Sequence, residues 1–139
     1  RGLLTEPALR GADRAHGREI FRRACGSCHV LHGEGGAVGP DITGANRGSL
    51  DYLLSNILAP SDVIQDAYRM HVVLLNDGRI HSGIPAGEDG EQLRLRVANQ
   101  PEPIVIPLAE IASRETSAHS LMPDGLLAAL EDAGPVPEP

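Results

Sequence analysis

Residues 25–29 read Cys-Gly-Ser-Cys-His, and both cysteines of the 139-residue chain lie in this stretch. A Cys-x-x-Cys-His run is the attachment motif of a c-type haem. The two thiols can add to the two vinyl groups of the porphyrin, and the histidine that follows is then held beside the iron. The fold must therefore enclose a porphyrin. We expect one haem c, attached through Cys25 and Cys28, with His29 as an axial iron ligand.

Three other interpretations of the motif have less support. Structural zinc takes four protein ligands, but Cys25 and Cys28 with His29 or His32 make only part of a site, and no second Cys-x-x-Cys or His-x-x-x-His pair is present. A thioredoxin-like motif follows a strand and opens a helix, whereas this motif follows a helix-like segment and precedes a glycine-rich loop. A chance match is uncommon in a chain so poor in cysteine.

Composition narrows the class of partner. The formal net charge is −7, and all twelve basic residues are arginines. An acidic chain is a poor ligand for nucleic acid, so we expect no nucleic-acid partner. Without lysine, electrostatic docking must use arginine clusters or the acidic surface. We also expect no membrane span in this chain, and one domain with at most a small insertion.

Three segments have the periodicity of helices. Residues 13–24 form the first, with Asp13 as the N-terminal cap. Ser49 caps a second helix with an apolar face over residues 50–58, and Pro60 ends it. A short closing helix is expected at about residues 124–132.

Between the second and third helices the pattern changes to an alternation with period two. Asn76-Asp77-Gly78-Arg79 is typical of a tight hairpin turn. Four or five short antiparallel strands suggest a small SH3-like or Sm-like barrel, or a twisted meander. The expected strands are residues 70–76, 80–85, 93–97, 104–106 and 111–115.

The order of these motifs resembles class I cytochrome c. More closely, it resembles a haem-binding domain family common in planctomycetes and verrucomicrobia, which is often found at the C-terminal end of large exported dehydrogenase-like proteins. Besides the haem motif, the matching segments are residues 39–44 (Gly-Pro-Asp-Ile-Thr-Gly), 50–58, 77–79 and 120–126.

The resemblance implies an α+β fold, in which a small antiparallel β-barrel or meander is inserted into a cytochrome c-like helical domain before the axial-methionine loop. The predicted boundaries follow from it. They are an N-terminal extension (1–12), a haem domain (13–67 and 118–132), an inserted β-rich subdomain (68–117) and a flexible tail (133–139).

The resemblance also implies how the iron is held. The backbone carbonyl of Pro40 accepts a hydrogen bond from His29, and Met122, which follows a loop and precedes a proline, is the favoured second axial ligand. Ile42 belongs to the matching haem-binding segment, and Thr43, Asn46 and Arg47, which follow the Gly-Pro-Asp-Ile segment, are candidates to hydrogen-bond the haem propionates. Other candidates for the second ligand stay open, His119 first among them. The rest are Met70, the histidines at positions 16, 32, 71 and 81 (His16, His32, His71 and His81), a water molecule, or no second ligand at all.

These residues favour an electron carrier over an enzyme. Histidine and methionine together would leave no open position on the iron for a substrate, and no distal acid–base pair is evident for a peroxidase. We expect single-electron transfer to or from a redox partner protein or an upstream dehydrogenase domain, in a periplasmic or otherwise exported location. The alternative is a haem-based gas or redox sensor with a displaceable methionine. The β-rich segment could dock a partner or cover the haem.

Overall fold

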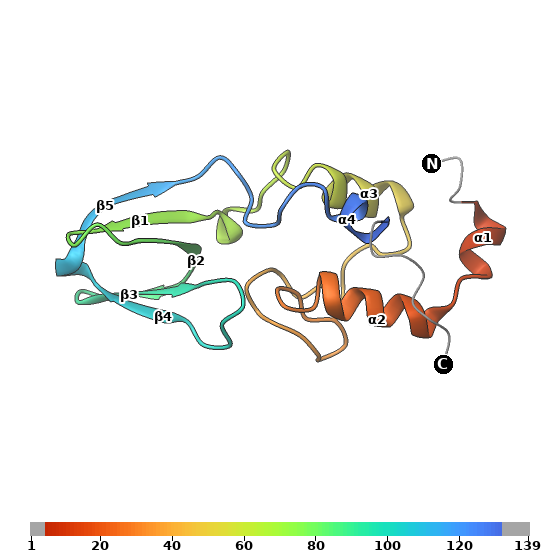
Figure 1. Cartoon of the computed structure of the whole chain (residues 1–139), viewed down its shortest axis with the longest axis horizontal. Helices are drawn as coiled ribbons and strands as arrows, with labels where there is room; N and C mark the ends of the chain where they lie inside the picture. The colour runs from red at the N-terminus through yellow and green to blue at the C-terminus, as the bar shows by residue number, and fades with distance from the viewer. Residues whose placement is uncertain (1–4, 132–139) are drawn as a thin grey trace.

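A computed structural model gives the fold of residues 5–131, which are the residues described here. The helices gather at one end of the molecule and the strands at the other (Figure 1). The predicted flexible tail at 133–139 lies outside the described residues.

Side-chain caps start the helices where the sequence predicts them. Helix α2 (Arg14–Ala24) begins after Asp13, whose Oδ1 accepts the backbone N–H groups of Ala15 and His16. Helix α3 (Leu50–Leu58) begins after Ser49, whose hydroxyl accepts the N–H of Tyr52. Both predictions are confirmed, because a cap supplies a partner for N–H groups that the first turn leaves free.

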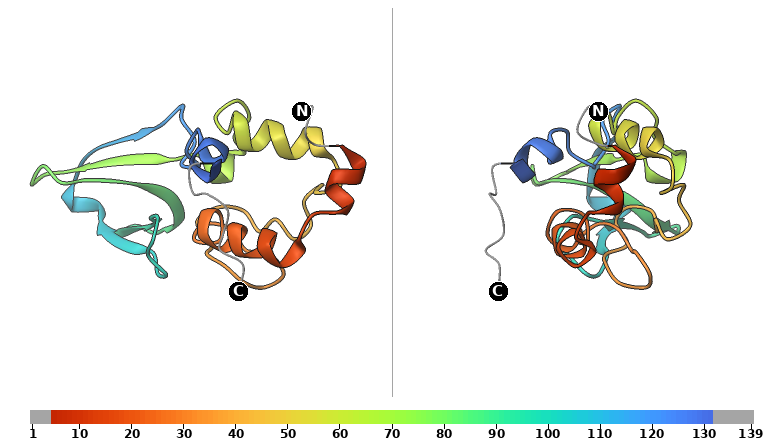
Figure 2. Two further views of the ribbon diagram at one scale, coloured as in Figure 1. Left: turned by 45° about the vertical axis from the view of Figure 1, so that its right-hand side comes forward. Right: turned by 90° about the vertical axis from the view of Figure 1, so that its right-hand side faces the viewer.

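Two helices differ from expectation. The short helix α1 (Glu6–Arg10), capped by Thr5, lies in the segment expected only as an extension. Helix α4 (Leu126–Glu131) starts two residues later than predicted, since Gly125 has a φ of +77° and cannot continue into a right-handed helix. Helix α4 lies beside α3, and α2 lies on the other side of this end of the molecule (Figure 2).

The five predicted strands are present and form one antiparallel sheet in the order β4-β3-β2-β1-β5. The hairpin turn at residues 76–79 joins the first two, with Gly78 at a φ of +89°. The strands are β1 (His71–Leu75), β2 (Ile80–Glu88), β3 (Gln92–Arg96), β4 (Ile104–Pro107) and β5 (Ile111–Thr116).

The expected barrel is wrong, since the sheet is not closed; the first four strands follow one another as in a meander. Strand β2 pairs with β1 through its first half and with β3 through its second, and a bulge lies between Pro85 and Gly87. A 3₁₀ turn (Leu108–Glu110) links the edge strands β4 and β5. The N–H of Leu108 in this turn donates to the carbonyl of Glu91, just before β3, and the carbonyl of Glu110 accepts from the N–H of Asn76, just after β1. These backbone groups are therefore satisfied without a hydrogen-bonded pairing of β4 with β5.

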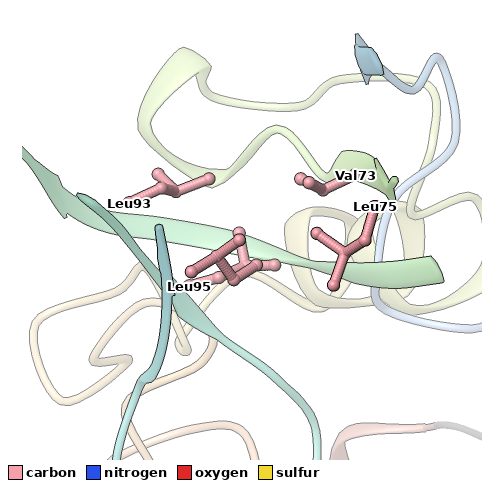
Figure 3. Close-up of a cluster of buried hydrophobic side chains, with 5 residues drawn as sticks. Val73, Leu75, Leu93 and Leu95 are labelled. Atoms are coloured by element: carbon pink, nitrogen blue, oxygen red, sulfur yellow. The ribbon is translucent and has the colours of Figure 1, made fainter. Parts of the chain in front are cut away.

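The hydrophobic core lies within the β-rich end. Val73, Leu93 and Leu95 are completely buried there, and Leu75 and Ile106 nearly so (Figure 3). They alternate along their strands with outward-facing residues, as expected for a sheet with one buried face. In contrast, neither α2 nor α3 contains a buried residue.

Hydrogen bonds connect the segment that enters the sheet to the segment that leaves it. The N–H of Ser117 donates to the carbonyl of Met70 over 2.8 Å. The N–H of Ser120 donates to the hydroxyl of Ser61 over 3.0 Å, which ties the chain after β5 to the segment after α3. The segment before α4 is therefore held close to α3.

Candidate functional site

The cysteine motif forms a tight turn that continues from the end of α2. The N–H groups of Cys28 and His29 both donate to the carbonyl of Cys25, over 3.1 and 3.0 Å. The N–H of Cys25 still bonds to Phe21 in the last turn of the helix. Both thiols are free and half-buried. The helix thus delivers the two thiols and the imidazole on one short turn, as covalent attachment of a porphyrin requires.

The environment of the Cys25 thiol does not favour thiol–disulfide chemistry. Burial raises the pKa of the Cys25 thiol above its usual value of 9.0, and neighbouring Cys28 adds to the increase. Redox-active Cys-x-x-Cys pairs rely on the opposite shift, because the thiolate is the nucleophile. Among residues 5–131, no three His, Cys, Asp or Glu side chains come together as ligands for a metal ion.

The ring of His29 is held by the loop that follows it. Its Nδ1 lies 2.8 Å from the backbone carbonyl oxygen of Pro40. A carbonyl oxygen can only accept, so Nδ1 carries the proton and Nε2 keeps its lone pair. This arrangement, expected from the resemblance, is typical of a histidine that binds a metal through its other nitrogen.

Three glycines let this loop pass close to the motif. A Cβ added to Gly39 would lie 2.7 Å from Cε1 of the His29 ring. A Cβ on Gly35 would overlap the carbonyl oxygen of His29, and one on Gly36 would overlap that of Ser27. The backbone also bonds there, since the N–H of Gly39 donates to the carbonyl of Cys28 over 2.7 Å. A side chain at any of the three would push the loop off the motif.

An ion-pair cluster that the sequence analysis missed ties the same loop to α2. Nη2 of Arg18 lies 3.1 Å from both carboxylate oxygens of Glu34, and Nη2 of Arg22 lies 3.2 Å from Oε2. Hydrogen bonds from the two arginines lower the pKa of Glu34. Arg18 and Arg22 are four residues apart on one face of α2, but nothing in the local sequence indicated their partner 12 to 16 residues away.

Ile42 and the residues proposed to bind the propionates lie on the next part of the loop. Ile42 is half-buried, and its N–H donates to the carbonyl of Val30 over 2.9 Å. Asn46 and Arg47 are exposed. Nη2 of Arg47 donates to the carbonyl of Thr43 over 3.0 Å, so this guanidinium already has one partner within the loop.

The two methionines flank the sheet in the sequence: Met70 directly precedes β1, and Met122 follows β5. Met122 is half-buried, and its N–H donates to the hydroxyl of Ser120 over 3.1 Å. Since Ser120 is bonded to Ser61, Met122 belongs to the side formed by α3 and α4, whereas His29 follows α2. Met70 is also half-buried, and its carbonyl accepts from Ser117.

Helices α2, α3 and α4 carry apolar side chains that are only half-buried. The donor set and these faces fit a haem, because a porphyrin is a large, mostly apolar plate that two thioethers and an imidazole can hold. The half-buried residues are Ile20, Phe21 and Ala24 on α2, Leu50, Leu53, Leu54 and Ile57 on α3, and Leu126, Leu127 and Leu130 on α4.

Comparison with known families agrees with this chemistry. Residues 14–72 match the family model described as Cytochrome c. The match covers the haem motif, the glycine-rich loop and α3, and it supports a cytochrome c-like family for this segment. Such a domain suggests electron transfer through haem c bound by the two cysteines. No curated protein matches the chain.

The match ends just as β1 begins. Met122 and most of the sheet therefore lie outside the matched segment, and the comparison does not address the second ligand or the inserted strands. Among the described residues, no helix has the length and apolar character needed to cross a membrane.

Proposed function

We propose that this chain is a c-type cytochrome domain that carries single electrons on one haem, attached through Cys25 and Cys28, with His29 and Met122 as axial ligands. The observation that carries the proposal is the hydrogen bond from Nδ1 of His29 to Pro40 within a Cys-x-x-Cys-His turn. It leaves Nε2 as the donor atom of the imidazole.

When bound, the haem would supply the Fe(III)/Fe(II) couple. The chain's own contribution is to attach it, orient it and limit the access of water. The carbonyl of Pro40 keeps the imidazole in one tautomer, and Gly39 allows the loop to pack against the ring. As a ligand, the neutral thioether of Met122 would favour reduced iron and so raise the potential.

Asn46 and Arg47 are proposed to bind the propionates, and Ile42 to lie against the porphyrin. Their position supports this, since all three are on the loop between His29 and α3. The exposed guanidinium of Arg47 keeps donors beyond the one that bonds to Thr43.

We further propose that the chain is a member of the planctomycete and verrucomicrobial haem-binding family. Its electrons would pass to or from a redox partner or an upstream dehydrogenase domain, in the periplasm or another exported location. Cytochrome c domains are typically exported, which supports this location.

The test is to produce the chain with a haem c maturation system and record its mass and optical spectrum. We expect the mass of one haem added covalently, a reversible one-electron wave, and slow binding of carbon monoxide to the reduced protein. The variant with both cysteines changed to alanine should carry no covalent haem. A chain that matures without haem would refute the proposal, and rapid carbon monoxide binding would favour the sensor alternative.

A further inference from the structure

A cavity of about 450 Å³ lies between the haem-attachment turn and the loop that joins β3 to β4. The two loops face each other between the two ends of the molecule (Figure 1). The attachment side contributes Ser27, Gly36 and Val38, and the sheet side contributes Arg96, Asn99 and Glu102. Val38 is only 5% exposed, although the helices around it have no buried residue, so the two ends of the molecule meet here.

Arg96 is unusual among the arginines of the chain. Its side chain is half-buried at the cavity, yet it makes no hydrogen bond or ion pair with any residue in the described range 5–131. Six other arginines bond to carboxylates, as Arg114 does to Glu88 over 2.8 Å. Partial burial of a guanidinium without a partner costs free energy, and an anion that pairs with the guanidinium would offset part of that cost.

The other polar groups around Arg96 suit an anion with two oxygens. The amides of Asn99 and Gln100 and the hydroxyl of Ser27 are donors that line the same cavity. A guanidinium donates two parallel N–H groups to a carboxylate, and the pair is stronger than a neutral hydrogen bond. Glu102 also lines the cavity but forms no ion pair with Arg96, so its charge opposes an incoming anion.

We propose that this cavity binds a carboxylate group through Arg96. The carboxylate could come from a small organic acid or from an acidic side chain of a redox partner, and the second source rests on the proposed function. The site then lies directly beside the haem-attachment turn, and the inserted sheet supplies its main charge.

The test follows the amide resonances of Ser27 and Gly36 in the reduced, haem-loaded chain while acetate is added at constant ionic strength. We expect saturable shifts. Arg96→Gln should weaken binding about tenfold or more. Arg94→Gln is the matched control, because Arg94 lies on the same strand, has the same charge and does not line the cavity. Equal losses in both variants would overturn the proposal.

A second variant is expected to bind acetate more tightly, a result that poor folding could not produce. Glu102→Gln removes the opposing charge and should tighten acetate binding about twofold or more. Glu91→Gln is the matched control. It removes the same charge at the residue before β3, away from the cavity, and should leave acetate binding unchanged. No difference between these two variants would contradict the proposal.

A hexaglutamate peptide distinguishes the two sources of the carboxylate. Peptide binding much tighter than acetate, and lost in Arg96→Gln, would identify a partner's acidic surface as the source. Peptide binding no tighter than acetate would identify a small organic acid. The optical spectrum reports haem independently, so failure of the anion site leaves the haem proposal intact.

Discussion

Nδ1 of His29 lies 2.8 Å from the backbone carbonyl oxygen of Pro40, eleven residues further along the chain. The glycine before Pro40 has no side chain to separate the loop from the ring, and its own N–H bonds to Cys28. The loop thereby holds the imidazole by its Nδ1 proton, and its backbone at Gly39 passes close to the ring atoms. The orientation of the ring depends on a backbone that passes very close to it.

Gly39→Ala should disturb the ring directly. The new Cβ would lie 2.7 Å from Cε1 of His29, closer than van der Waals contact allows, so the ring or the loop must move. We expect a loss of roughly 1–3 kcal/mol in the free energy of unfolding of the haem-loaded chain, and altered His29 resonances. Gly44→Ala is the control, since nothing lies within 4 Å of its added Cβ. If the two variants behave alike, the contact with the ring is not important.

Met122→Ala should remove the side chain that we propose as the second axial ligand. We expect the weak near-red methionine–iron band of the oxidised protein to disappear and the midpoint potential to fall on the order of 0.1 V, because axial ligands set the potential over a range of about 0.8 V. The control is Met70→Ala, the other half-buried methionine, which should keep the band. Loss of the band in Met70→Ala alone would assign the ligand to the start of β1 instead.

Val73→Ala should destabilise the sheet. Val73 is completely buried, so the variant should lose roughly 1.5–3 kcal/mol of unfolding free energy in a urea titration. Val105→Ala makes the same chemical change on an edge strand where the side chain is 53% exposed, and it should cost less than about 0.5 kcal/mol. Comparable losses would mean that the sheet does not bury Val73 as described.

The stability of the chain should fall as the pH is lowered below about 6.5, the ordinary pKa of histidine. Partial burial and then the nearby charge of Arg114 lower the pKa of His71, whereas Glu88 raises it. Nε of Arg114 donates to Nδ1 of His71, so the folded state favours the neutral ring. The unfolded chain therefore takes up a proton first, and stability is lost from about pH 6.5 down through the lower pKa of the folded state.

Urea unfolding between pH 5 and 8 measures this dependence. His71→Gln should flatten the curve in this range, and Arg114→Gln should remove only part of the slope, since burial is the larger cause. An unchanged slope in His71→Gln would refute the assignment. Carboxylates with a lowered pKa, such as Asp77 and Asp89, act near pH 4 and below, outside this range.

Local sequence patterns predicted most of the secondary structure. Asp13 and Ser49 start their helices because a cap needs only a backbone three residues away. The Asn76–Arg79 turn forms because Gly78 accepts a positive φ. In contrast, the length of β2 was underestimated, because the bulge that lets it continue past Pro85 depends on pairing with β3.

The haem-attachment turn, its histidine and the succession of helices and strands were determined by the sequence itself, because each depends on residues within a few positions of one another. Tertiary structure decided which distant groups meet. It paired Arg18 and Arg22 with Glu34, left the sheet open, and brought Arg96 of β3 to the cavity beside Ser27, where its side chain has no partner among residues 5–131. Such contacts depend on how whole elements pack, and hydrophobic burial is too non-directional for a local pattern to specify them.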